Sequence, residues 1–399
     1  MKTLFEGQRL DMRSSIEHTI DSLRAHARDR HLVVTWSGGK DSTTLLTLVV
    51  WMIESGKIPR PKSLTVLYAD TRMELLPLSF AAQEIRKELD DRSWIEHRTV
   101  MAPIDKRFMV YMLGRGVPPP NNNTLRWCQR QIKIDPMTEA VDRLVADRGK
   151  VLCLIGLRLG ESAARDGRIA LSCGTNGAEC GQGWYQASIG DKSADKLSPI
   201  LHWRVCHVWE WLRHWAPLAE FGDWSTEVIA DAYGGDEAEE INARTGCVGC
   251  PLASKDTALD TVLAQPRWAY LRPLTELRAL WRELRMPQHR LRMPSGERRK
   301  DGTLVDKQNR MGPLTLAART MALDRVLDIQ SRCNTAAVAL GRPIVDMLNA
   351  EEEHRIRELV AAGTWPRRWS GHEPLATDHF DEDCDDLFTA MTVNGRAAS

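Results

Sequence analysis

A short segment rich in glycine and hydroxyl groups, Ser37-Gly-Gly-Lys-Asp-Ser42, carries the residue types that bind phosphate. Glycines let the backbone approach a polyanion, and the first N–H groups of a helix attract negative charge. Lys40 adds a point charge, and Ser42 and Thr43 add hydroxyls. We therefore predict that this loop cradles the phosphates of a nucleotide. The residues expected to do so are Ser37, Gly38, Gly39, Lys40, Asp41 and Ser42.

The flanking sequence predicts the elements that position this loop. The run His31-Leu-Val-Val-Thr-Trp36 is short, apolar and β-branched, as in a buried strand, and residues 42–53 are amphipathic, as in a helix. The spacing is too short for a Walker A loop, which needs Gly-x4-Gly-Lys-Ser/Thr. The alternative is a Gly-Gly turn that binds nothing, which the lysine and the hydroxyls disfavour.

Strands and helices are predicted to alternate through the first half of the chain. Further strands are expected at 64–68, 95–100 and 151–156, and helices at 11–30, 74–90 and 129–147. This alternation predicts an α/β fold with a doubly wound, mostly parallel sheet, followed by a helical C-terminal region. In such sheets ligands lie at the carboxyl ends of the strands. Ser37, Asp70 and Arg158 each follow a predicted strand, so we expect them to converge on one cleft.

Composition and charge restrict the class of protein. The chain has 399 residues and no net charge, so any affinity for nucleic acid must come from a local patch. The basic segment 290–300 is one candidate, and a solvated loop is the alternative. No apolar run approaches the ~20 residues of a membrane span, and residues 1–9 lack the apolar core of a signal peptide. We expect a cytoplasmic protein without membrane contact.

The predicted organisation has four parts. An N-terminal helix covers residues 1–30, and the nucleotide-binding domain covers 31–255. A helical region with the basic segment covers 256–375, and an acidic tail, predicted to be disordered, covers 376–399. In a reducing compartment the nine cysteines are not expected to form disulfides. Cys153, inside an apolar run, is expected to be a buried small hydrophobe.

Several short sequence motifs resemble those of one protein superfamily. Ser37–Ser42 resembles the PP-loop of ATP pyrophosphatases, which cleave ATP between the α- and β-phosphates. The word Arg126-Trp-Cys128-x4-Lys133-x2-Pro136 resembles a signature of the phosphoadenosine-phosphosulfate (PAPS) reductase family. So does the segment 197–212, with its Pro-Ile-x-x-Trp and Val-Trp-x-x-Leu words. Together these similarities cover roughly residues 30–255.

Three further motifs resemble those of the DndC and SspD branch of this superfamily. Proteins of that branch are the ATP-pyrophosphatase components of DNA phosphorothioate modification. The three motifs lie at 156–165, at 246–250 and at 310–319. The long C-terminal part also favours this branch, since a PAPS reductase typically ends soon after its sulfonucleotide domain. The resemblance implies a bacterial defence enzyme that uses ATP and Mg²⁺ to adenylate a DNA phosphate before sulfur replaces an oxygen. Its expected partners are DNA, a cysteine desulfurase and other subunits of a phosphorothioation complex.

The resemblance and the predicted positions together give the candidate site. Asp41 and Asp70 are candidates for holding the metal or the adenosine; the alternatives are a first-turn helix charge and a helix N-cap. If residues 158–165 are helical, the two arginines there share a face and suit phosphate, or else form an exposed ion-pair ladder. The catalytic candidates are Lys40, Asp41, Cys128 and Arg158, and the further nucleotide-binding candidates are Asp70, Arg126, Arg158, Glu161 and Arg165.

Cys247-x-x-Cys250 is half of a metal site, and thiolate sulfur suits an iron–sulfur cluster or Zn²⁺. Cys128 is the expected third ligand of a [4Fe–4S] cluster, and its neighbours Arg126 and Lys133 are expected to help keep the thiolate charged. Relatives often carry another cysteine soon after the pair, but here the next is Cys333. The predicted fourth ligand is Cys180, with Cys173 as the alternative; a zinc site would have Cys206 and His207 as further ligands.

Three other functions stay open. A PAPS or adenylyl-sulfate reductase needs a thiolate near the C-terminus, but the acidic neighbours of Cys384 would raise its pKa. A tRNA thiolase would use the same loop on a different polymer. A non-catalytic ATP-sensing subunit of a defence complex would keep the loop and need no cluster. The tryptophans at 203–224 suit base stacking, but their spacing favours a helix packed on the sheet.

Overall fold

The computed structural model describes residues 10–122, 125–160, 166–167, 178–179, 184–188, 194–235, 246–293, 301–303 and 311–379. The chain forms two compact units that interleave in sequence. The first is drawn from 1–102, 130–248 and 257–269, and the second from 103–129, 249–256 and 270–399. The units therefore divide the chain differently from the predicted ranges, because residues 103–129 belong with the C-terminal region.

A seven-stranded sheet in the order β3-β2-β1-β4-β7-β6-β5 is the centre of the first unit. Strands β1 to β4 and β7 pair in parallel, and β5 and β6 add an antiparallel edge. This confirms the predicted fold class. The strands are β1 (His31–Trp36), β2 (Ser63–Ala69), β3 (Ile95–Val100), β4 (Val151–Ile155), β5 (Ala178–Glu179), β6 (Trp184–Gln186) and β7 (Asp195–Ser198).

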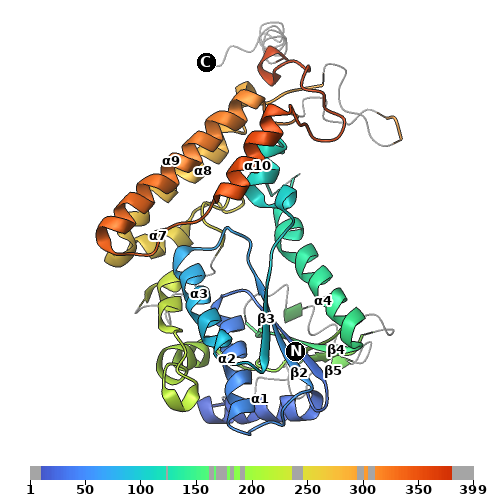
Figure 1. Cartoon of the computed structure of the whole chain (residues 1–399), viewed down its shortest axis with the longest axis vertical. Coiled ribbons are helices and arrows are strands. Elements are labelled where there is room, and N and C mark those ends of the chain that lie inside the picture. The colour runs from blue at the N-terminus through green and yellow to red at the C-terminus, as the bar shows by residue number, and fades with distance from the viewer. Residues whose placement is uncertain are drawn as a thin grey trace, which may run out of the picture. The chain divides into compact units, whose positions relative to one another are not determined.

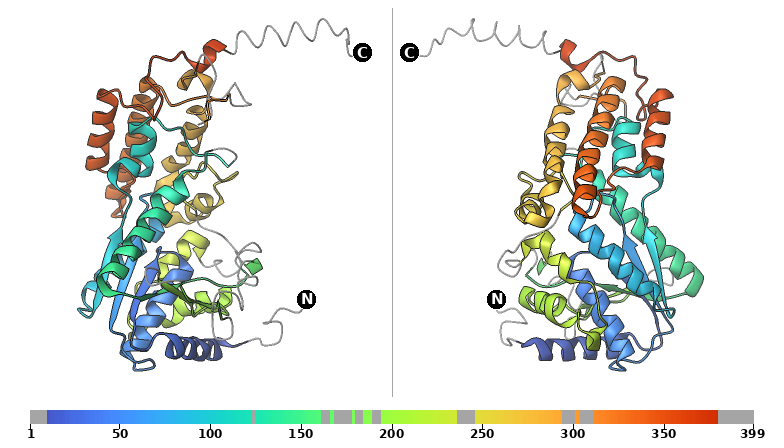
Figure 2. Two further views of the ribbon diagram at one scale, coloured as in Figure 1. Left: turned by 90° about the vertical axis from the view of Figure 1, so that its right-hand side faces the viewer. Right: turned by 60° about the vertical axis from the view of Figure 1, so that its left-hand side comes forward.

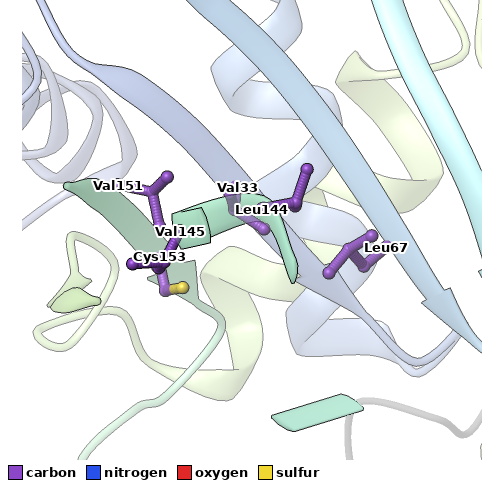
Figure 3. Close-up of a cluster of buried hydrophobic side chains, with 6 residues drawn as sticks. All are labelled: Val33, Leu67, Leu144, Val145, Val151 and Cys153. Atoms are coloured by element: carbon purple, nitrogen blue, oxygen red, sulfur yellow. The ribbon is translucent and has the colours of Figure 1, made fainter. Parts of the chain in front are cut away.

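Helices cover both faces of this sheet, with α4 on one side and α2 and α3 on the other (Figure 1). They are α2 (Lys40–Glu54), α3 (Leu76–Asp90) and α4 (Asp135–Arg148); the π-helical turn Arg130–Ile134 precedes α4. Alternate residues of the strands form the core under α4, where Val33 and Cys153 pack against Leu144 (Figure 3). Cys153 is 4% exposed and burial raises the pKa of its thiol to about 12, which confirms the predicted apolar role.

Two buried tryptophans fix α2 on the other face. The indole N–H of Trp36 donates to Thr43 Oγ1 and that of Trp211 donates to Thr47 Oγ1, both at 2.8 Å. These bonds explain polar residues in a helix whose surroundings are apolar, because a buried indole N–H needs a partner. Trp203, Trp209, Trp211 and Trp224 are at most 1% exposed, so the prediction that they pack in the core is confirmed.

The rest of the first unit is helical. The chain enters through α1 (Met12–His26), whose Thr19 hydroxyl accepts the Trp203 indole N–H at 2.9 Å. The remaining elements are α6 (Val205–Glu210), the π-helical turn Trp211–Trp215, the 3-10 helices Ala219–Phe221 and η6 (Glu227–Tyr233), and α7 (Thr257–Leu263). A further 3-10 helix, Pro266–Thr275, crosses the division between the units.

The second unit is helical, as predicted. Its longer helices are α8 (Glu276–Glu283), α9 (Leu316–Leu340) and α10 (Ala350–Ala361), and α9 packs against both of the others (Figure 2). Its short helices are Ile104–Lys106, Val110–Gly114, Pro287–His289 and Ala376–His379. Within the described part of the chain, no helix combines the length and the apolar composition needed to cross a membrane.

Two arginines singled out by sequence motifs are structural in this unit. Arg319 is fully buried and donates to the carbonyl oxygens of Gly114, Leu314 and Thr364 at 3.2, 3.1 and 2.6 Å. Arg290, the first residue of the predicted basic segment, is 8% exposed and donates to the Gly312 carbonyl at 2.6 Å. Arg290 therefore has a structural role; the predicted DNA contact of the segment stays a prediction, because residues 294–300 lie outside the described residues.

Candidate nucleotide-binding site

The loop after β1 turns sharply into the first turn of α2. Gly38 has φ +72°, which L side chains rarely adopt, and Gly39 is the N-cap of α2. The Ser42 hydroxyl donates to the Gly39 carbonyl at 3.0 Å and accepts the Ser37 N–H at 3.2 Å. The hydroxyl of Ser42 therefore closes the turn, and the start of α2 points its N–H groups toward the carboxyl end of β1.

A chain of ion pairs lies at the start of α2. Lys40 Nζ is 3.0 Å from Asp41 Oδ2, and the Arg158 guanidinium is bonded to the other oxygen of the same carboxylate. Arg158 also donates to the Trp203 carbonyl at 3.3 Å and is only 5% exposed. Two cations share one carboxylate, so the cluster keeps one positive charge beside the positive end of the helix dipole. Such a place favours a polyanion.

Gly156, the first residue after β4, lies directly against this turn. A Cβ at Gly156 would be 2.7 Å from the carbonyl oxygen of Asp41 and 2.8 Å from the Cα of Ser42. Only a residue without a side chain lets β4 and the start of α2 approach so closely. The loop after β4 and the loop after β1 are therefore in direct contact.

Replacing Gly156 with alanine should therefore damage the site without removing any functional group. We expect about 1–3 kcal/mol of strain and an affinity for ATP lower by roughly ten- to a hundred-fold, measured by calorimetric titration. Gly246→Ala is a matched control, because a Cβ there meets nothing within 4 Å. Equal affinities of the two variants would contradict the close packing.

A cavity of about 720 Å³ opens at the carboxyl ends of β1 and β4. The chain runs from β1 to β2 and β3 on one side, whereas β4 lies on the other, so the cavity occupies the switch point where doubly wound sheets bind ligands. Its volume suits a ligand of nucleotide size. Among its lining residues are Ser37, Ser42, Lys133, Gly156 and Ser188.

A buried carboxylate fixes one wall of the cavity. Asp195 is 1% exposed and accepts hydrogen bonds from Ser188 N–H and Oγ at 2.8 and 3.0 Å and from the Tyr185 hydroxyl at 3.0 Å. Burial alone would raise its pKa, but these bonds and the one from Arg30 hold the pKa of Asp195 well below its usual range. Asp195 therefore stays charged and holds Tyr185 and Ser188 against the start of β7.

The expected convergence on one cleft is confirmed only in part. Ser37 lines the cavity, and Arg158 contacts the same loop by its ion pair with Asp41. The Asp70 carboxylate instead accepts the N–H of Arg72 at 2.8 Å, closing a turn in which Arg72 has φ +63°. Asp70 is therefore held at the carboxyl end of β2 and does not line the cavity. Glu161 and Arg165, predicted to bind the nucleotide, lie outside the described residues.

The predicted metal ligands are divided between the two units. Cys128 and Cys250 belong to the second unit and lie close enough for Cys250 to influence the Cys128 thiol. Cys247 belongs to the first unit, where the next residue, Val248, donates its N–H to the Met73 carbonyl at 2.7 Å. Cys180 and Cys173 lie outside the described residues. Among the described residues no three His, Cys, Asp or Glu side chains are arranged to hold a metal ion.

The expected help from flanking cations is present for Arg126, which lowers the pKa of the Cys128 thiol, but burial outweighs it. Burial raises the pKa of Cys128, and the nearby Cys250 raises it further, whereas Arg126 lowers it only in part. Arg126 is exposed, and Lys133 belongs to the first unit, where it lines the cavity. The sequence spacing places both cations near Cys128 along the chain, but it does not reveal the burial that outweighs them.

Sequence patterns did not reveal Tyr233 at the loop 37–42 or the buried carboxyl of Glu74 after β2. Tyr233 accepts the Lys40 N–H with its hydroxyl at 3.3 Å. Glu74, after β2, accepts the Thr71 hydroxyl at 2.6 Å, and burial raises its pKa. A buried carboxyl with a raised pKa near the ligand edge of a sheet is typical of functional sites. No spacing pattern marks Tyr233, whereas Glu74 carried one usable signal, its position four residues after Asp70 at a predicted strand end.

Part of the chain resembles a known protein family. Residues 31–218, a little under half of the chain, match the family model described as the phosphoadenosine phosphosulfate reductase domain. This part of the chain is therefore similar to that domain. No curated protein matches the chain.

Three solved structures resemble the chain weakly. The U34-tRNA thiolase NcsA of Methanococcus maripaludis, solved with its [4Fe-4S] cluster, is 14% identical over 68% of this chain and 79% of its own, with a TM-score of 0.34. The PAPS reductase of Candida auris is 12% identical over 51% and 87%, with a TM-score of 0.31. The FMN adenylyltransferase of Candida glabrata is 15% identical over 50% of this chain and only 55% of its own, with a TM-score of 0.30. Likenesses of this strength support no functional conclusion.

Proposed function

We propose that the chain is a PP-loop ATP pyrophosphatase that adenylates an oxygen of a DNA phosphate so that sulfur can replace it. The observation that carries the ATP part is the loop 37–42, held between β1 and Gly156 beside a cavity of about 720 Å³. The proposed acceptor follows from the three sequence words shared with the DndC and SspD branch.

The chemistry begins with attack by a DNA phosphate oxygen on the α-phosphorus of ATP, which releases pyrophosphate. Catalysis of such in-line displacement depends mainly on positioning and on neutralising the leaving charge. In this chain the start of α2 and Lys40 would bind the pyrophosphate, and Arg158 would hold Asp41 so that Lys40 keeps its place. Sulfide, or the outer sulfur of a persulfide, then attacks the DNA phosphorus, and AMP leaves with the original oxygen. After attack by a persulfide, a thiol reductant must cleave the remaining S–S bond to leave the phosphorothioate.

Magnesium enters this scheme with the nucleotide. Mg²⁺ is typically held by substrate phosphates, waters and one or two carboxylates. Asp41 is engaged by two cations and Asp70 by the Arg72 N–H. The described carboxylates therefore form no dedicated cage, and we propose that Mg²⁺ arrives as MgATP.

The sulfur must come from a partner, and we propose a cysteine desulfurase acting with other subunits of a phosphorothioation complex. A [4Fe–4S] cluster stays part of the proposal, with Cys128, Cys247 and Cys250 as ligands and Cys180 as the fourth. Among the described residues Cys128 and Cys250 lie close together, but no three His, Cys, Asp or Glu side chains form a ligand set. No step of the reaction above is therefore assigned to a cluster.

The cluster can be tested separately from activity. We expect protein purified without oxygen to contain about four iron and four sulfide ions per chain, and Cys128→Ser or Cys250→Ser to lose most of both. Cys153→Ser is the control, because this thiol is buried in the apolar core. Stoichiometric zinc in place of iron would contradict the cluster and favour a Zn²⁺ site.

A PAPS or adenylyl-sulfate reductase is the second candidate, favoured by the domain match at 31–218. Its C-terminal nucleophile would have to be Cys384, which lies outside the described residues. Release of sulfite from PAPS with a thiol reductant would support it. Release of pyrophosphate from ATP that depends on DNA and on the sulfur-supplying partner would support the adenylating function instead.

A further inference from the structure

Tyr233 is the last residue of η6 and is buried at 3% exposure. Its ring packs edge-on against Trp209, with 5.1 Å between the ring centroids. The middle of η6 is anchored, because Asp231 accepts the Trp268 indole N–H at 2.6 Å and pairs with Arg267. Tyr233 is followed by two glycines with positive φ values, Gly234 at +124° and Gly235 at +64°.

The side chain of Tyr233 contacts the loop 37–42 in two ways. Its hydroxyl oxygen accepts the N–H of Lys40 at 3.3 Å. Its ring lies under the Lys40 ammonium, with Nζ 4.9 Å from the centroid. A Cβ placed on Gly39 would be 3.4 Å from the same hydroxyl. The tyrosine therefore covers the side of the loop on which α2 begins.

The N–H of Lys40 is one of the first donors of α2, and such donors have no acceptor within the helix. They are the groups that bind anions at a helix N-terminus. A phosphate oxygen can use this donor only after the Tyr233 hydroxyl has left it. The same movement would take the ring off the Lys40 ammonium, which stays paired with Asp41 at 3.0 Å, and expose its other side to phosphate.

We propose that Tyr233 is a positioning residue that holds Lys40 and its N–H until the phosphates of ATP or pyrophosphate displace the hydroxyl. This inference rests on the proposed function, since it concerns the same loop. The anchored Asp231 and the two glycines confine the displacement to the end of η6. Tyr233 thus sets affinity and binding rate rather than chemistry.

Tyr233→Phe tests this directly, because it removes the hydroxyl and keeps the ring. The variant loses a neutral hydrogen bond that competes with the ligand, so the dissociation constants of pyrophosphate and of MgATP should fall by about three- to ten-fold. The association rate in stopped flow should rise, and the midpoint of thermal unfolding without ligand should fall slightly. Tyr270→Phe is a matched control, since its hydroxyl donates to the Pro343 carbonyl at 2.6 Å in the second unit.

The measured affinities distinguish the proposed role of Tyr233 from the alternatives. Weaker binding by Tyr233→Phe would mean that the hydroxyl contacts phosphate directly, and unchanged binding would mean a structural role only; either would overturn the inference while leaving ATP binding intact. A wild-type chain that binds neither pyrophosphate nor MgATP would overturn the proposed function and the inference together. Tighter binding by Tyr233→Phe, with Tyr270→Phe unchanged, is the result that we expect.

Discussion

Replacing Arg158 with leucine should lower the free energy of unfolding by about 1.5–3 kcal/mol, because it removes a nearly buried charge-assisted hydrogen bond to Asp41. The side chains of Arg158 and Asp41 are only 6% and 13% exposed, so solvent compensates little. The loss should appear in urea denaturation followed by tryptophan fluorescence. ATP affinity should fall as well, since Lys40 then faces Asp41 alone.

The matched control is Arg143→Leu, which breaks an ion pair with Glu139 whose side chains are 72% and 59% exposed. Exposed pairs of this kind contribute at most about 0.5 kcal/mol. Removing both charges with Arg158→Leu and Asp41→Asn should cost less than the sum of the single changes, because the two groups are in contact. Similar losses for Arg158→Leu and Arg143→Leu would show that the buried chain of charges does not stabilise the site.

Replacing Lys40 with alanine should reduce pyrophosphate release from ATP by about 10²–10³-fold, the usual effect of removing one preorganised group that stabilises developing charge. The fold should survive, since the Asp41 carboxylate keeps Arg158 as its partner. Release should be measured with DNA and the sulfur-supplying partner present. Lys87→Ala, at a lysine that is 71% exposed on α3, should be without effect. Full activity of Lys40→Ala would remove this loop from the reaction.

Local patterns were enough to predict the elements around the loop. The β-branched run 31–36 and the amphipathic run 42–53 form β1 and α2 where expected, because each pattern is fixed by neighbours a few residues away. The burial of Trp203, Trp209, Trp211 and Trp224 was predicted for the same reason, whereas Trp215 is only partly buried. The Ser-Gly-Gly turn also identified the place where the cavity opens.

Properties that depend on distant contacts were not predictable in this way. Tyr233 reaches Lys40 across 193 residues of chain, and nothing in its local sequence indicates the contact. The pKa of Cys128 depends on burial, which neighbouring charges in the sequence do not report. Residues 103–129 join the C-terminal region through packing that the alternation of strands and helices does not specify. The burial of Arg290 likewise depends on a distant contact, the Gly312 carbonyl 22 residues further along the chain.

The central claim is that this ATP site serves sulfur insertion into DNA, and mass spectrometry of nuclease-digested DNA tests it most directly. DNA should come from cells that carry the full operon with either the intact chain or Lys40→Ala. The account predicts phosphorothioate-linked dinucleotides with the intact chain and none with the variant. Their absence with the intact chain in a competent operon, or their persistence with Lys40→Ala, would contradict it.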